Sequence, residues 1–211
     1  MTSRLISALV LLGCCAGPGV RSILAQSRPS SSGLVQELQS EKTTDEARKQ
    51  LLRLGKSEPD VRRYLAVHLP ALIQPGPNSC PPSDITDLDV RWHSCPWYNA
   101  VELAGKLKIA EAAPTLGPWI ATRTSPTIIG LSSELRLGPY PVATALWKIG
   151  NPAVPVVQYI LESDQRPRFR SIDERVLCII NTPEAKAALR AFLPLETDPD
   201  LQAGIKSCLG E

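Results

Sequence analysis

The stretch Ala145-Leu-Trp-Lys-Ile-Gly-Asn-Pro-Ala-Val-Pro155 decides the fold of this chain. It contains an apolar helix end, a short turn and a second helix that Asn-Pro opens. The same pattern returns 31 positions later at 176–185 (Val-Leu-Cys-Ile-Ile-Asn-Thr-Pro-Glu-Ala) and occurs about 41 positions earlier at 104–114 (Ala-Gly-Lys-Leu-Lys-Ile-Ala-Glu-Ala-Ala-Pro). A period of roughly 20 to 50 residues built on helix pairs is typical of a solenoid, in which each pair buries its apolar face against its neighbours.

The composition also favours helices. Of the 211 residues, 43% are hydrophobic and 21% are charged, whereas only 5% are aromatic. An apolar set dominated by Ala and Leu suits close helix packing better than a β-sandwich. Several of the 20 prolines stand where a helix would begin, at Pro59, Pro152, Pro183 and Pro199.

The charge balance argues against nucleic acid as a partner. The chain has 23 basic and 21 acidic residues, and its formal net charge is +2. Arg4 and Arg21 of the N-terminal segment account for this excess, so the remainder is neutral. A nucleic-acid-binding protein normally carries a basic excess on one face.

Residues 1–26 have the pattern of a secretory signal: a basic start at Arg4, an apolar run at 5–16, a turn, and small residues around Ala25. The apolar run is shorter than the roughly 20 residues that a membrane span needs. We therefore expect export to the periplasm or the cell exterior, followed at 27–42 by a flexible linker and a short lead-in helix.

A lipoprotein signal is the alternative interpretation of the same segment. Leu11-Leu12-Gly13-Cys14 resembles a lipobox, although Leu12 fits its second position poorly. In that case Cys14 is the lipidated N-terminus, and a lipid anchor is the chain's one membrane contact.

Export changes the expected state of the cysteines. Removal of the signal leaves Cys80, Cys95, Cys178 and Cys208, which are expected to form disulfides in an oxidising compartment. Cys80 and Cys95 share one loop-like segment and are the favoured pair, worth roughly 3 kcal/mol by loop entropy. A helical wheel places Cys208 on the apolar stripe of its helix, whereas Cys178 lies opposite the apolar stripe of its own helix. Two alternatives therefore remain: Cys178 and Cys208 form a second disulfide, or both are buried free thiols.

The domain is predicted to span 43–211 and to begin with a capping box of Thr43 and Glu46. It contains about four helix pairs and a terminal helix that opens at Asp198-Pro199. Two segments without helical periodicity, 75–96 and 123–140, are expected as irregular inserts.

The residues at 145–155 resemble the bacterial HEAT-repeat pattern, and Leu-Ala-Gly-Lys-Leu-Lys-Ile-Ala-Glu-Ala-Ala-Pro at 103–114 resembles a variant of it. The resemblance covers 98–209 well and 43–74 loosely, and the two irregular inserts depart from it. It implies an all-α fold, a right-handed, armadillo-like α-solenoid. It also implies that the second helices line a concave surface that binds other proteins.

Four residues at the end of the first insert are candidates for an interface: Trp92, His93, Trp97 and Tyr98. Aromatic residues of this kind anchor many protein interfaces. The competing interpretation is that they pack the insert onto the first helix pairs.

Catalytic and metal sites find little support. The sequence contains no nucleophile elbow, phosphate-binding glycine loop or His-Glu-x-x-His helix, and His68 lies on an apolar stripe as a core residue would. The acidic, Cys and His residues of the first insert lack the close ligand pairs of a zinc site and the turn glycine of a calcium loop. These are Cys80, Asp84, Asp87, Asp89, His93 and Cys95.

We therefore expect an exported protein-interaction or scaffold module that is not an enzyme and holds no cofactor or metal. Its partner is another protein. The alternative is a small-ligand-binding protein or enzyme that uses residues 75–97 as a lid over an enclosed pocket.

Overall fold

The computed structural model describes residues 30–77, 80, 94–123, 137 and 139–211. This part of the chain contains helices and no strand, which confirms that the fold is all-α. The α-helices are α1 (Ser31–Leu38), α2 (Thr44–Ser57), α3 (Pro59–Ile73), α5 (Pro96–Lys106), α6 (Ala113–Leu116), α8 (Pro141–Ile149), α9 (Val154–Ser163), α10 (Pro167–Ile180), α11 (Pro183–Phe192) and α12 (Pro199–Leu209). Among the described residues, none of these helices is long and apolar enough to cross a bilayer.

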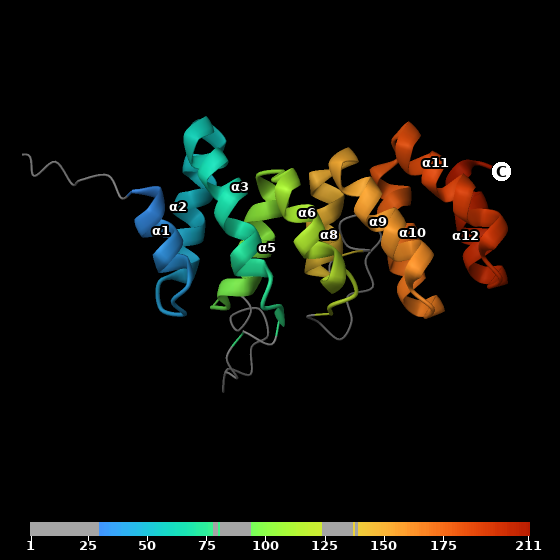
Figure 1. Cartoon of the computed structure of the whole chain (residues 1–211), viewed down its shortest axis with the longest axis horizontal. Helices are drawn as coiled ribbons and strands as arrows, with labels where there is room; N and C mark the ends of the chain where they lie inside the picture. The colour runs from blue at the N-terminus through green and yellow to red at the C-terminus, as the bar shows by residue number, and fades with distance from the viewer. Residues whose placement is uncertain (1–29, 78–79, 81–93, 124–136, 138) are drawn as a thin grey trace, which may run out of the picture.

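The helices follow one another along the long axis of the molecule, from α1 to α12 (Figure 1). They form two layers. In the first layer α2, α5, α8, α10 and α12 contact one another in that order. In the second layer α3 contacts a segment at 110–119, that segment contacts α9, and α9 contacts α11. Each element therefore packs against near neighbours in the sequence.

The segment at 110–119 of the second layer, here called the interrupted segment, is not one continuous helix. A 3-10 turn η2 (Ala110–Ala112), the one-turn helix α6 and a second 3-10 turn η3 (Gly117–Trp119) follow one another in it. Pro114 and Pro118 stand at the starts of α6 and η3, and each lacks the N–H that a continuous helix needs. The interruption therefore follows from the sequence.

Prolines open most helices of the domain, as predicted. Pro59, Pro183 and Pro199 are the first residues of α3, α11 and α12. Pro152 lies instead in the 3-10 turn η4 (Asn151–Ala153), directly before α9. A proline costs least at these positions because the first amides of a helix have no intrahelical partner.

The sequence pattern predicts helix caps at Asn151 and Thr182 as well as the capping box at Thr43, and two of these three caps differ in the structure. Thr182 does cap α11, since its hydroxyl accepts the N–H of Ala185 at 3.2 Å. Asn151 is not the cap of its helix; its side-chain oxygen accepts a 2.8 Å hydrogen bond from Thr182, which joins two successive junctions. The capping box at Thr43 is also wrong, because the Thr43 hydroxyl donates to the carbonyl of Glu37 at 2.7 Å.

The closest approach in the first layer is between α5 and α8. A Cβ atom added at Gly105 would lie 2.7 Å from the Cα of Ala145, so only glycine fits there without displacing backbone. The apolar core continues on either side of this contact, with fully buried leucines from both layers, including Leu65, Leu103 and Leu146. Burying each such side chain contributes about 1.5–3 kcal/mol.

Charged groups also link the first-layer helices. Arg48 of α2 pairs with Glu102 of α5 at 2.8 Å. Near the C-terminus, Nε and Nη2 of Arg170 donate to the two carboxylate oxygens of Glu196 at 2.8 and 2.7 Å. Glu196 also accepts the backbone N–H groups of Thr197 and Asp198, which fixes the turn that leads into α12.

Both cysteine pairs are joined. The predicted bridge between Cys80 and Cys95 is confirmed, with a Cα–Cα distance of 5.2 Å. Cys178 and Cys208, which the sequence left open, form a second disulfide across 5.6 Å between the Cα atoms and tie α10 to α12. The wheel argument missed this bridge because α10 has two contact faces, one toward the second layer and one toward its neighbours within the first.

Most of the two predicted inserts, the signal segment with Cys14, and Trp92, His93, Asp84, Asp87 and Asp89 lie outside the described residues. The two disulfides are consistent with an oxidising, exported location.

A candidate protein-binding face

Two of the four aromatic candidates can be placed. Trp97 is 1% exposed, and its indole N–H donates to the carbonyl of Ile73 at 3.1 Å. It therefore packs α5 onto the end of α3 and cannot anchor a partner. Tyr98 is half-buried at a cavity between α5 and α8.

The cavity beside Tyr98 is small. Its volume is 130 Å³, below the roughly 300–1,000 Å³ of typical ligand pockets. Glu102 on its wall is held by ion pairs with Lys106 and Arg48. The polar groups of this cavity thus contribute to helix-to-helix contacts.

His68 is half-buried rather than in the core, and its ring lies against Tyr64 with 4.0 Å between centroids. The fully buried stripe of α3 passes beside it through Leu65, Leu69 and Ile73. Among the described residues no group of three or more His, Cys, Asp or Glu side chains could hold a metal ion.

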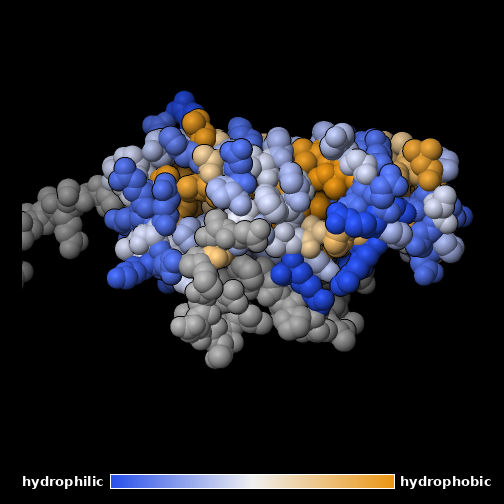
Figure 2. All heavy atoms as spheres, turned by 60° about the horizontal axis from the view of Figure 1, so that its bottom comes forward, coloured by the Kyte–Doolittle hydropathy of each residue, from blue (hydrophilic) through white to orange (hydrophobic). Residues whose placement is uncertain are grey.

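Exposed apolar side chains gather on the second layer. Among the described residues, three large hydrophobic side chains are strongly exposed: Val67 (73%), Tyr159 (72%) and Leu195 (68%). Val67 lies on α3, Tyr159 on α9, and Leu195 in the 3-10 turn η5 (Leu193–Leu195) that follows α11. Figure 2 shows hydrophobic surface gathered right of centre on one face, over the α8–α9 part of the chain.

Two grooves flank the interrupted segment, one on the side of α3 and one on the side of α9. The groove toward α3 has a volume of 510 Å³, and the groove toward α9 has a volume of 610 Å³. Pro118 lines both grooves, so they lie on either side of this residue. The walls of the first are Val67, Pro70, Ala71, Gln74, Thr115, Pro118 and Trp119; those of the second include Pro114, Ile120, Val156, Tyr159 and Ile160.

One ion pair closes the far end of the second groove. Nε and Nη2 of Arg166 donate to the two carboxylate oxygens of Asp164 at 2.9 and 2.8 Å. These hydrogen bonds from Arg166 hold the pKa of Asp164 below its ordinary value. Because both charges are already paired, this pair offers no unpaired charge to a ligand.

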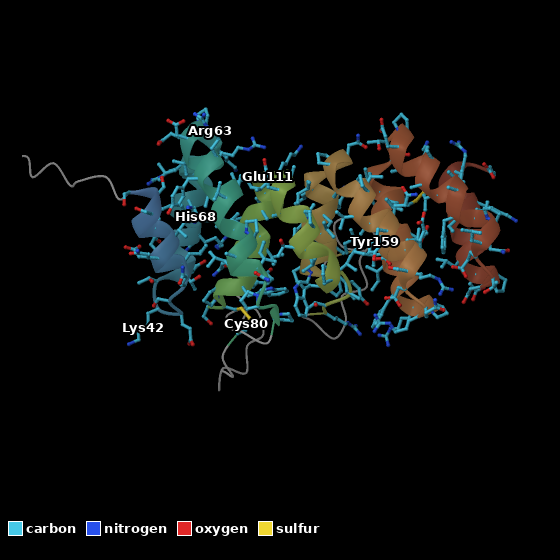
Figure 3. The ribbon with its side chains drawn as sticks, in the orientation of Figure 1. Lys42, Arg63, His68, Cys80, Glu111 and Tyr159 are labelled. Carbon is cyan, nitrogen blue, oxygen red and sulfur yellow. A yellow bond between two sulfur atoms is a disulfide. The ribbon has the colours of Figure 1, made fainter. Side chains whose placement is uncertain are left out.

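A basic pocket of 340 Å³ lies at the other end of the face, between the start of α3 and η2. Arg62, Arg63, Lys108 and Glu111 line it. Arg63 pairs with Asp60, whereas neither Arg62 nor Lys108 is in an ion pair in the described part of the chain. Figure 3 shows Arg63 and Glu111 near one edge of the molecule and Tyr159 farther along, on α9.

Asp173 of α10 is a buried carboxyl group in the C-terminal half of the fold. It is 0% exposed, and neither of its carboxylate oxygens has a hydrogen-bond partner among the described residues. Burial, with the nearby charge of Asp164, raises the pKa of Asp173 to about 8. At neutral pH it is therefore mostly protonated.

Val67 and Tyr159 are not among the residues predicted from the sequence, although their positions on their helices carry a signal. The buried residues of α9 are Val154, Val157 and Leu161, and Tyr159 falls off that stripe. Val67 likewise falls off the stripe of α3. A helical wheel therefore places both residues outside the buried stripes of their helices.

Comparison with known protein families, with characterised proteins and with solved structures finds no match to this chain.

Proposed function

We propose that this chain is an exported, non-catalytic protein-interaction module. It is built as a right-handed, HEAT-like α-solenoid of about four helix pairs and a terminal helix. The pairing of first-layer and second-layer helices in sequence order supports this architecture. The two disulfides support export.

The observation that carries the interaction role is the second-layer face. On this face the exposed side chains of Val67 and Tyr159 each line one of the two grooves on either side of Pro118. Solenoids bind partners along such extended surfaces. In contrast, the first layer is occupied by contacts between its own helices.

The experiment is an affinity enrichment from envelope extract with the exported protein. The test variant is Val67→Asp with Tyr159→Asp, which places two charges on the second-layer face. The matched control is Gln36→Asp with Ala203→Asp, which adds the same charge at exposed positions on α1 and α12.

We expect the wild type and the control variant to enrich the same proteins, and the face variant to lose them at least tenfold. Circular dichroism checks that all three proteins fold alike. The proposal is wrong if the face variant, which lacks Val67 and Tyr159, enriches the same proteins as the wild type. It is also wrong if the purified protein turns over a small substrate.

A further inference from the structure

We infer that the occupant of the second-layer face is an extended, proline-containing apolar peptide segment with an acidic residue at the end that lies over Arg62 and Lys108. This inference rests on the proposed function and names the chemistry of its partner.

The grooves set the length of the segment. They lie on either side of Pro118, one toward α3 and the other toward α9. Neighbouring packed helices lie about 8–10 Å apart, so the path between Val67 and Tyr159 is roughly 20 Å. An extended chain covers this distance with about six residues.

The groove walls select uncharged, apolar side chains. Of the described residues that line the two grooves, only Asp164 and Arg166 are charged, and they pair with each other. A charged side chain placed between Val67 and Tyr159 would lose hydration without gaining a partner. Apolar side chains instead bury against Pro, Val, Ile and aromatic surface.

The same walls favour proline in the occupant. The uncharged polar side chains that the grooves offer to a peptide backbone are chiefly Gln74, Thr115, Ser163 and Gln165. A proline brings no N–H that needs a partner, and an extended proline-containing chain loses less entropy on binding. Aromatic-lined grooves elsewhere bind such segments in this way.

The acidic end of the peptide segment is inferred from the positive charge on one face of α3. The residues of α3 that line the basic pocket and the first groove recur at steps of three and four, so they share one stripe. Its N-terminal half carries Arg62 and Arg63, and its C-terminal half carries Val67 and Pro70. With Arg63 paired to Asp60, the cations Arg62 and Lys108 outnumber the single acid Glu111. A peptide that fills the groove thus meets positive charge at this end.

Two pools of labelled synthetic peptides test the inference by fluorescence polarisation. Each peptide has six positions drawn from Pro, Leu and Val. It carries one pair of charged residues, at its N-terminus in half of the peptides and at its C-terminus in the other half. The pair is Glu-Glu in one pool and Lys-Lys in the other. We expect the acidic pool to bind the wild type at least tenfold more tightly than the basic pool. The variant Arg62→Glu with Lys108→Glu should reverse this preference, and Val67→Asp with Tyr159→Asp should abolish binding of both pools.

The outcomes separate this inference from the proposed function. Equal binding of the two pools overturns the acidic end. Failure of both pools, while envelope proteins still depend on Val67 and Tyr159, overturns the extended apolar segment but leaves the proposed function in place. A concentration-dependent dimer in analytical ultracentrifugation that the face variant loses would show that a second copy of the chain is the occupant instead.

Discussion

The two layers of helices use their side chains differently. The first layer is cross-linked from one helix to the next, by the Gly105–Ala145 contact, the Arg48–Glu102 pair and the Cys178–Cys208 bridge. The second layer contains a segment broken by prolines and exposes Val67 and Tyr159. The first layer therefore joins its helices by a close backbone contact, an ion pair and a disulfide, whereas the second layer exposes large apolar side chains.

The largest expected effect comes from breaking the most buried ion pair. Arg170→Met leaves Glu196, 1% exposed at its side chain, without its cation. Removing one partner of a buried pair costs about 3–5 kcal/mol. Chemical denaturation at pH 7 measures the loss in the free energy of unfolding, with Arg168→Met, an exposed position on the same helix, as the control.

The same pair gives this loss a pH dependence. Burial alone would raise the pKa of Glu196, but the hydrogen bonds from Arg170 and from the N–H groups of Asp198 and Thr197 outweigh it, so its pKa is lowered. A lowered folded pKa stabilises the fold above the unfolded value, and this contribution is lost as the pH falls through the folded pKa. The difference between wild type and Arg170→Met should therefore shrink below pH 4.5. A difference that stays constant down to pH 3 contradicts this account.

Asp173→Asn should change stability in the opposite pH range. The folded pKa of Asp173, about 8, is above its ordinary value of 3.8, so between these values the folded state holds a proton that the unfolded state has released. Wild-type stability should then fall with rising pH by at most roughly 1.4 kcal/mol per unit, about 3 kcal/mol from pH 5 to 7. The amide that replaces the carboxyl group does not titrate, so thermal melts of the variant should be flatter across this range. Parallel pH profiles of the two proteins would falsify the assignment.

Substitution of two glycines in the first layer should change the free energy of unfolding in opposite directions. Gly105→Val forces side-chain atoms against the backbone of Ala145, and overpacking of this kind costs about 1–3 kcal/mol. Gly204 of α12 has its nearest neighbour, Glu174, at 3.6 Å from an added Cβ. Gly204→Ala should therefore stabilise the chain by up to about 1 kcal/mol through helix propensity. Melting temperatures of both variants check the pair, and a loss in Gly204→Ala would show that α12 tolerates no added volume.

The smallest expected effect lies in the second layer. Val67→Asp with Tyr159→Asp changes two strongly exposed side chains, and surface substitutions usually alter the free energy of unfolding by less than about 0.5 kcal/mol. Urea denaturation of this variant beside wild type measures it. A loss above roughly 2 kcal/mol, well outside that surface range, would mean that these residues hold the fold together, and the contrast between the layers would disappear.

The recurring pattern at 145–155 predicted helices and their starts because proline position and apolar spacing are local properties of the sequence. Helix starts at Pro59, Pro183 and Pro199 followed directly from it. The bridge between Cys80 and Cys95 was also predictable, since the two share one short segment.

What the sequence did not predict depends on contacts between elements. A helical wheel identifies one apolar face of a helix, whereas α10 contacts neighbouring helices on several sides. The wheel therefore did not show that Cys178 faces Cys208. Trp97 resembled an anchor in a loop but fills a space between α5 and α3. The grooves beside Pro118 lie between adjacent second-layer elements, and their walls come from residues that are far apart in the sequence.

The bridge between Cys178 and Cys208 has a mechanical consequence. A row of units that each touch only their neighbours can peel apart from its two ends, where the outermost helix has contacts on one side alone. Here the final helix is covalently fastened to α10, whereas α1 at the opposite end has no such fastening among the described residues. Under a pulling force or an exopeptidase, the helices should therefore separate first at the N-terminal side. Unfolding of this repetitive molecule then has a preferred direction.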